Sequence, residues 1–183
     1  MKLKFSKEDI LTIPNMLSFF RLLLIPVIVV TYLKYDNFSL TVILVLLSGL
    51  TDVLDGFIAR KFNMISDFGK ILDPIMDKLT QAAMLLCLFS RFTKMIYLFL
   101  LLSVKEIITA ITGIIGINKS GEVKGADWHG KLSTCTLYAM MIVHMLWYDI
   151  PQHVSDFFVT ICAFVMCMSF VLYVMRNIKL IKK

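Results

Sequence analysis

The sequence predicts an all-α integral membrane protein with six transmembrane helices and a short interfacial helix at its amino terminus. The chain has 183 residues, of which 58% are apolar, a higher share than a soluble domain of this length carries. Apolar stretches long enough to span a bilayer as helices recur along the chain, and polar connections separate them. Basic residues gather near the ends of these stretches. We therefore expect one membrane domain over residues 1–183.

Charge and cysteine content exclude several classes of protein. The net charge of +6 favours attraction to anionic lipid head groups. No patch combines basic and aromatic residues as nucleic-acid readers do, so we expect no nucleic-acid partner. The four cysteines are scattered through apolar stretches without a CxxC pair, which indicates neither a zinc site nor a disulfide framework.

The amino-terminal part predicts an interfacial segment followed by the first span. Residues 1–14 mix lysines with apolar residues, which is typical of an amphipathic helix in the membrane interface or of a frayed tail. We expect no cleavable signal peptide, because no small-residue cleavage site precedes the first apolar stretch. The first span covers residues 15–34 and contains Pro26, which we expect to kink it. Arg21, also in this span, either reaches back to the membrane surface or faces a polar pocket.

Five further spans complete the predicted bundle. We expect them at residues 38–60, 70–90, 95–117, 132–147 and 154–175. Pro74 falls near the start of the third span, where its missing N–H matters least. Lys105 and Glu106 are adjacent in the fourth span, so their side chains should not face each other on one helix. The longest polar connection, residues 118–131, precedes the fifth span.

Lysine and arginine are distributed unequally between the two ends of these spans. Most of the 19 lie in the two tails and in the second and fourth connections, which a six-span topology places on one side of the membrane. The opposite side carries Lys34, Arg91 and Lys94. The positive-inside rule therefore predicts a multi-pass protein of the cytoplasmic (inner) membrane with both termini in the cytoplasm.

Four aspartates lie where the second and third spans approach the same membrane face. Asp52 and Asp55 are three residues apart, so they share one face of a helix, and Asp73 and Asp77, four apart, share another. Two such faces turned towards each other make an oxygen-rich site, and hard cations such as Mg²⁺ or Mn²⁺ prefer oxygen ligands. We therefore predict two divalent cations at these four carboxylates. The alternatives are helix caps at the membrane surface and a cation pathway.

Two small residues and an arginine follow the first aspartate pair. Gly56 and Ala59 leave room for a ligand or a backbone to approach closely on the face of Asp55. Arg60 adds a guanidinium fork that suits phosphate. This end of the second span therefore favours a phosphate-containing ligand beside the carboxylates.

These residues form the pattern DxxDGxxARx8GxxxDxxxD, which begins at Asp52 and ends at Asp77. At every defined position it resembles the signature of the CDP-alcohol phosphotransferases. The resemblance implies a six-helix membrane enzyme that moves a phosphatidyl group from CDP-diacylglycerol to an alcohol and releases CMP. It also implies that the four aspartates ligate two cations, with Asp77 as the catalytic base. The positive-inside rule places these aspartates on the cytoplasmic side. The donor-nucleotide contacts that it implies are Asp52, Gly56, Ala59, Arg60, Ser66 and Gly69.

Flanking segments are similar to those of phosphatidylglycerophosphate synthases within this family. The opening IPNMLSFFRLLLIP also resembles that of eukaryotic-type cardiolipin synthases, and it favours a role for Asn15 and Arg21 near the polar pocket. The segment WHGK resembles the WxGK of the same synthases, whereas Lys105-Glu106 departs from their Arg-Glu and replaces a two-point phosphate grip with a point charge. The acceptor-binding residues thereby implied are Arg21, Lys105, His129 and Lys131.

The expected acceptor is a small anionic alcohol, glycerol-3-phosphate, which would give phosphatidylglycerophosphate in phospholipid biosynthesis. Phosphatidylglycerol, as used by a cardiolipin synthase, is the first alternative, and inositol phosphate or another alcohol comes next. A cation channel or transporter and a catalytically silent membrane scaffold are alternatives from other classes. We also expect a homodimer in the bilayer.

Overall fold

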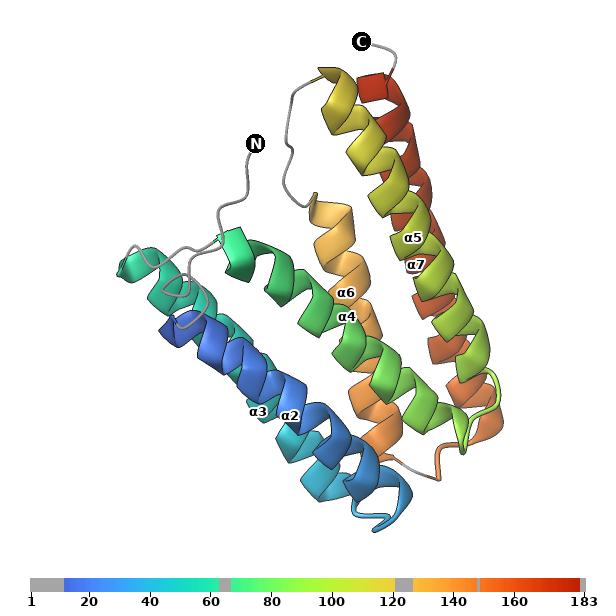
Figure 1. The fold of residues 1–183 in the computed structure, drawn as a ribbon. Coiled ribbons are helices and arrows are strands. Elements are labelled where there is room, and N and C mark those ends of the chain that lie inside the picture. Colours follow the sequence, from blue (N-terminus) through green and yellow to red (C-terminus); the bar gives the residue numbers. More distant parts are fainter. Residues whose placement is uncertain (1–11, 63–66, 121–126, 148, 182–183) are drawn as a thin grey trace. The chain divides into compact units, whose positions relative to one another are not determined.

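The computed structural model describes residues 12–62, 67–120, 127–147 and 149–181, and helices make up nearly all of this part of the chain (Figure 1). The helices are α2 (Ile13–Leu33), α3 (Phe38–Lys61), α4 (Asp67–Phe89), α5 (Met95–Ser120), α6 (Trp128–Leu146) and α7 (Gln152–Ile181). The predicted all-α class is confirmed. The expected interfacial helix falls mainly on residues 1–11, which lie outside the described residues.

Four of the helices are long and apolar enough to cross a membrane. They are α2, α3, α5 and α7, and they coincide with the first, second, fourth and sixth predicted spans. The chain is therefore a multi-pass integral membrane protein. The first half of α4 carries charged residues among its apolar ones, which lowers the mean hydropathy of that helix.

Several helices continue beyond the apolar stretches that predicted them. Helix α5 runs to Ser120 and α7 runs to Ile181, whereas the apolar stretches end near residues 117 and 175. Likewise α6 begins at Trp128 and not at residue 132. Hydrophobicity marks the part of a helix that can lie in lipid, and backbone hydrogen bonds extend the helix past it into polar surroundings.

The chain divides into two compact units, residues Met1–Cys87 and Leu88–Lys183, which we describe separately. In the first unit, α2 and α3 pack side by side after a tight turn (Figure 1). Asn37 caps α3 by accepting a hydrogen bond from the Leu40 N–H at 3.1 Å. The Tyr32 ring meets the Phe38 ring edge to face across this turn, at 5.3 Å between centroids. This hairpin fixes the register of α2 against α3.

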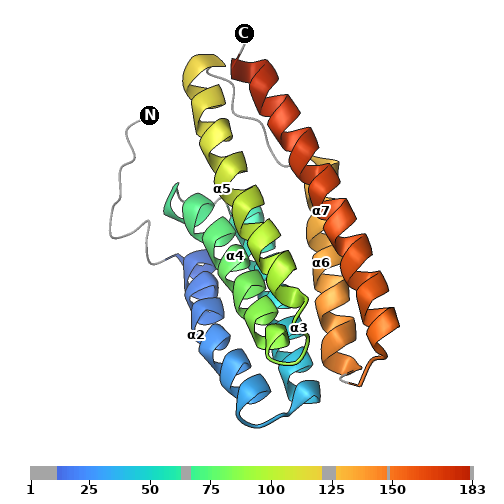
Figure 2. The same cartoon turned by 90° about the vertical axis from the view of Figure 1, so that its right-hand side faces the viewer.

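In the second unit, α5 and α7 run alongside each other (Figure 2). Asn177 of α7 donates through Nδ2 to Thr112 Oγ1 at 2.9 Å and to the Thr109 carbonyl at 3.3 Å. A Cβ at Gly116 would lie 3.4 Å from the Leu180 Cβ, so the absence of a side chain lets the two backbones approach. Small residues and interhelical hydrogen bonds thus hold this pair together.

Helices α6 and α7 make a second close contact in the same unit. His144 Nε2 lies 2.9 Å from Ser155 Oγ, which ties the end of α6 to the start of α7. At the other end, a Cβ at Gly130 would lie 2.1 Å from Tyr173 Oη, so a larger residue would force the Tyr173 ring to move. Close contacts at both ends of α6 therefore fasten it to α7.

Candidate active site

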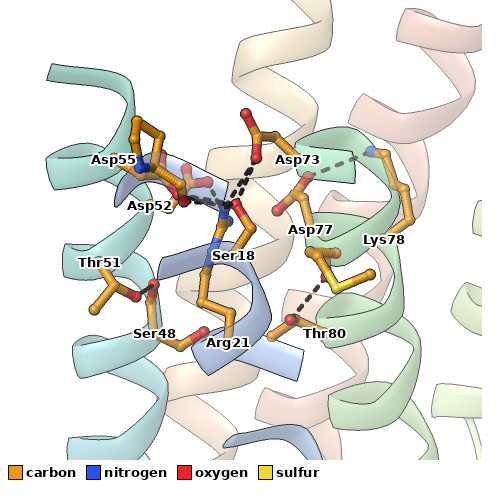
Figure 3. Close-up of polar contacts among 12 residues, drawn as sticks. Ser18, Arg21, Ser48, Thr51, Asp52, Asp55, Asp73, Asp77, Lys78 and Thr80 are labelled. Carbon is orange, nitrogen blue, oxygen red and sulfur yellow. Dashed lines mark hydrogen bonds and ion pairs between the residues drawn. The ribbon is translucent and has the colours of Figure 1, made fainter. Parts of the chain in front are cut away.

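The four aspartates of the sequence pattern all lie in the first unit. Asp52 and Asp55 are one turn apart on α3, while Asp73 and Asp77 are one turn apart on the first half of α4. Figure 3 shows these carboxylates turned towards the side chains of α2. The Asp55 side chain is 4% exposed, whereas that of Asp52 is 49% exposed. The predicted pairing of two aspartates on each of two helix faces is therefore seen in the structure.

Arg21 of α2 lies among three of these carboxylates. Its guanidinium donates to Asp52 Oδ1 through Nη1 and to Asp55 Oδ2 through Nη2, the latter at 2.6 Å. Nη2 also lies 3.5 Å from Asp73 Oδ1. The Arg21 side chain is 3% exposed, so of the two alternatives from the sequence the structure places it in the polar cluster (Figure 3). It supplies the positive charge that clustered carboxylates require in surroundings of low dielectric.

Ser18 belongs to the same cluster, although the sequence did not single it out. Its hydroxyl donates to Asp73 Oδ1 at 2.7 Å and accepts from Arg21 Nη2 at 3.1 Å. Ser18 therefore links α2 to α4, as Arg21 links α2 to α3. Asn15, Ser18 and Arg21 recur every three residues on the buried face of α2. That spacing of polar residues in an otherwise apolar span was the signal that could have identified Ser18.

Asp77 has surroundings that differ from those of the other three aspartates. Gln81, one turn further along α4, donates through Nε2 to Asp77 Oδ2 at 2.8 Å. Lys78 Nζ lies 3.8 Å from the same oxygen. Gln81 is also a residue that the sequence did not single out. Two side chains of its own helix thus contact the carboxylate predicted to act as a base.

The predicted donor-nucleotide residues are only partly described. Gly56 and Ala59 are partly buried on α3 beyond Asp55, and Gly69 is buried on α4. The Arg60 side chain and the whole of Ser66 fall outside the described residues.

The other predicted acceptor residues belong to the second unit. Lys105 is buried on α5, where Nζ lies 3.4 Å from Ser133 Oγ and 3.4 Å from Glu106 Oε1. The expectation that Lys105 and Glu106 do not face each other is therefore wrong, because two long side chains can meet beside the helix even from adjacent positions. Lys131 is exposed on α6.

His129 is buried at the start of α6 in a polar network. Its Nδ1 lies 3.3 Å from Ser169 Oγ and its Nε2 lies 3.2 Å from Asp127 Oδ2. Asp127 Oδ2 also accepts from Arg176 Nη1 at 2.8 Å, and the Arg176 guanidinium stacks over the Tyr173 ring. Both ring nitrogens of His129 thus face neighbouring side chains of this unit.

The chemistry of the carboxylate cluster fits hard divalent cations. Aspartate oxygens are the ligands that Mg²⁺ and Mn²⁺ prefer, and the cluster already gathers one buried cationic group. Within residues 12–62 and 67–120, no three carboxylates surround a common point that could hold a metal ion. Instead the Arg21 guanidinium lies between Asp52, Asp55 and Asp73. A divalent cation would therefore compete with Arg21 for these oxygens.

Comparison with known proteins gives matches along most of the chain. A cardiolipin synthase (CMP-forming) / mitochondrial hydrolase fusion protein of Schizosaccharomyces pombe is 42% identical over 48% of this chain and 14% of its own length. A CDP-diacylglycerol--glycerol-3-phosphate 3-phosphatidyltransferase of Rickettsia bellii is 41% identical over 43% of this chain and 45% of its own. These two alignments thus span less than half of each relative.

A longer alignment exists with the protein of the same name from Aquifex aeolicus. It is 31% identical over 94% of this chain and 99% of its own length. The model of the CDP-alcohol phosphatidyltransferase family matches residues 11–175, a range that includes both aspartate pairs and both compact units. On these matches, together with the geometry of the aspartates, the chain belongs to the CDP-alcohol phosphatidyltransferase family.

Proposed function

We propose that this protein transfers a phosphatidyl group from CDP-diacylglycerol to glycerol-3-phosphate and releases CMP, as a transferase of phospholipid biosynthesis. The observation that carries the proposal is the gathering of Asp52, Asp55 and Asp73 with Asp77 at neighbouring ends of α3 and α4. The similarity to the Aquifex protein over nearly the full length of both chains supports the choice of acceptor.

Enzymes of this family use divalent metal ions. Asp52, Asp55, Asp73 and Asp77 would hold two of them, Mg²⁺ or Mn²⁺. When bound, they would neutralise the pyrophosphate of the donor and the charge that develops on the leaving CMP. The clustering of the Asp52, Asp55 and Asp73 oxygens around a buried guanidinium supports the assignment of these three residues.

The chain's own residues then have distinct tasks in the transfer. A hydroxyl oxygen of the acceptor forms a bond to the phosphorus that bears the lipid, the bond from that phosphorus to the CMP oxygen breaks, and Asp77 takes the hydroxyl proton. Gly56 and Ala59 leave space for the nucleotide, and the Arg60 fork suits its phosphates. Ser66 and Gly69 flank the same region of the sequence.

Cationic side chains are proposed to bind the phosphate of the acceptor. They are Arg21, Lys105 and Lys131, with His129 as a further candidate. Because Lys105 is buried and paired with Glu106, its charge is held at one place in the second unit. The partial similarity to the Schizosaccharomyces fusion protein supports a second candidate acceptor, phosphatidylglycerol, which would make the product cardiolipin.

We also propose that α4 and α6 cross the membrane, which gives six spans. With 23 and 19 residues, both fall within the range of about 17–25 residues that a transmembrane helix takes. The distribution of lysine and arginine supports both termini and the aspartates on the cytoplasmic side of the inner membrane. A homodimer is part of the proposal.

The acceptor is tested by presenting purified protein with CDP-diacylglycerol, Mg²⁺ and one candidate alcohol at a time. We expect CMP and phosphatidylglycerophosphate with glycerol-3-phosphate, and much slower release of CMP with phosphatidylglycerol or inositol phosphate. Faster turnover with phosphatidylglycerol would assign the cardiolipin reaction instead. No CMP with any alcohol would favour a transporter or a scaffold.

A further inference from the structure

Gln81 lies one turn after Asp77 on α4, towards the carboxyl end of the helix. The side chains of Asp73, Asp77 and Gln81 recur every four residues, so they lie along one face of the helix. Gln81 is fully buried, at 0% exposure. Its Nε2 donates to Asp77 Oδ2 at 2.8 Å, whereas its Oε1 has no hydrogen-bond partner in the part of the chain that the structure describes. The amide nitrogen is thus hydrogen-bonded, whereas the amide oxygen is not.

The carbonyl half of the Gln81 amide does not stabilise the fold. A buried carbonyl oxygen without a donor costs free energy, and that cost is larger where water is scarce. The next turn of α4 carries Met84 and Leu85, both fully buried, so an apolar side chain of similar length would suit the same surroundings. The contact that distinguishes Gln81 from a methionine here is the hydrogen bond to Asp77.

The orientation of the amide follows from its partner. If the oxygen and nitrogen of Gln81 exchanged places, two oxygens would face each other at hydrogen-bond distance, which is repulsive for an ionised carboxylate. The N–H therefore points to Asp77. The terminal torsion of an aspartate is broad, so a hydrogen bond of this kind restricts the orientation of the carboxylate plane.

We propose that Gln81 is a positioning residue for Asp77. This inference rests on the proposed function, in which Asp77 takes the proton of the acceptor hydroxyl. A base must present an oxygen within about 3 Å of the proton that it removes. By holding Oδ2, the Gln81 amide fixes the plane of the carboxylate and thereby the direction in which it meets the acceptor. Gln81 lies outside the sequence pattern, which ends at Asp77.

The first test is the Gln81→Met variant, which keeps the length of the side chain and removes the donor. We expect kcat to fall about 10- to 100-fold, the loss typical of one hydrogen bond to a charged group, while the KM for CDP-diacylglycerol changes less than about twofold. The melting temperature should change little, since loss of the hydrogen bond to Asp77 is offset by removal of the unpartnered oxygen. A purely structural role would instead lower the melting temperature and leave kcat unchanged.

A matched control is available one position earlier. Thr80 is also buried on α4, but its hydroxyl donates to the Met76 carbonyl of its own helix at 2.9 Å. Thr80→Val removes a buried polar group at equal size and should leave kcat unchanged. If Gln81→Met does not fold, Gln81→Asn keeps the amide and shortens its reach, and it should show the same loss of kcat.

The decisive measurement is a double-mutant cycle with Asp77→Asn. If Gln81 acts through Asp77, adding Gln81→Met to Asp77→Asn should cause no further loss of kcat. Losses that multiply, or wild-type kcat in Gln81→Met, would overturn the inference while leaving the proposed function in place. Absence of turnover in the wild-type protein with every acceptor would instead contradict the proposed function, and the inference with it.

Discussion

Arg21 is a buried cationic residue whose guanidinium contacts three aspartates of the cluster, Asp52, Asp55 and Asp73. The guanidinium already uses lone pairs of these carboxylate oxygens, and its positive charge repels a divalent cation. Arg21 Nε is also buried without a hydrogen-bond partner there, so the side chain is held by its two terminal nitrogens. Release of Arg21 from Asp52 and Asp55 would free it to meet a phosphate.

Arg21→Gln is therefore expected to tighten the binding of Mn²⁺ by roughly tenfold. The physical reason is that the cation no longer has to displace a charge-assisted hydrogen bond, which is worth about 1.5 kcal/mol or more. The free Mn²⁺ concentration, followed by electron paramagnetic resonance during a titration, measures this affinity. Lys34→Gln removes the same charge at the other end of α2 and should leave it unchanged. Weaker binding in Arg21→Gln would mean that Arg21 supports the cations.

The aspartates differ in burial, so their variants should differ in stability. Asp52→Asn and Asp55→Asn are both expected to abolish transfer, since each loses a carboxylate oxygen. Asp55→Asn should also lower the free energy of unfolding by about 1–3 kcal/mol, because its 4% exposed side chain is bonded to a buried guanidinium. Thermal unfolding in detergent, alongside CMP release, separates the two effects. Equal melting temperatures, or activity in either variant, would contradict this assignment.

Lys105 tests the acceptor assignment. Lys105→Gln is expected to raise the KM for glycerol-3-phosphate about tenfold or more and to leave the KM for CDP-diacylglycerol nearly unchanged. Lys105→Arg should preserve or lower that KM, because a guanidinium grips phosphate through two nitrogens. Steady-state kinetics with each substrate varied in turn give both values. If neither variant alters use of glycerol-3-phosphate, Lys105 does not bind the acceptor.

Helix positions were predictable from the sequence because apolar length and charge placement decide which segments enter a membrane. One end of each of α5, α6 and α7 could not be predicted in this way, because these helices extend beyond their apolar stretches. For the candidate site, spacing placed the four aspartates on shared helix faces. Spacing could not show that Arg21 would bond to two of them, because that contact depends on how α2 packs on α3.

Single polar residues escaped prediction for a related reason. Gln81 lies in an apolar stretch, where an isolated polar residue has no pattern of its own until its partner is known. Ser18 shares a helix face with Asn15 and Arg21, but its bond to Asp73 depends on how α2 packs on α4. The pairing of Lys105 with Glu106 was predicted wrongly, because adjacent positions point to different helix faces but long side chains can reach each other beside the helix.

Two glycines that face α7, Gly130 on α6 and Gly113 on α5, should differ sharply in the effect of an alanine substitution on stability. Gly130→Ala would place a Cβ 2.1 Å from Tyr173 Oη and should lower the free energy of unfolding by about 1–3 kcal/mol. Gly113→Ala meets its nearest atom at 3.8 Å and should be neutral or stabilising, since alanine favours a helix by up to about 1 kcal/mol. Thermal unfolding of the two variants compares them directly. A stable Gly130→Ala protein would contradict this packing.

The family match extends over both compact units, so it covers the aspartates of the first and the cationic residues of the second. Asp52, Asp55, Asp73 and Asp77 fall in the first unit, and Lys105, His129 and Lys131 in the second. The six-span topology, the cytoplasmic orientation and the homodimer stay predictions from the sequence.

The most direct measurement follows CMP and lipid product together in one reaction of wild-type protein with CDP-diacylglycerol, glycerol-3-phosphate and Mg²⁺. We predict that one phosphatidylglycerophosphate appears for each CMP, that excess chelator stops both, and that added Mg²⁺ restores both. CMP release that continues in excess chelator, or that occurs without a new phospholipid, would contradict metal-dependent phosphatidyl transfer at the four aspartates.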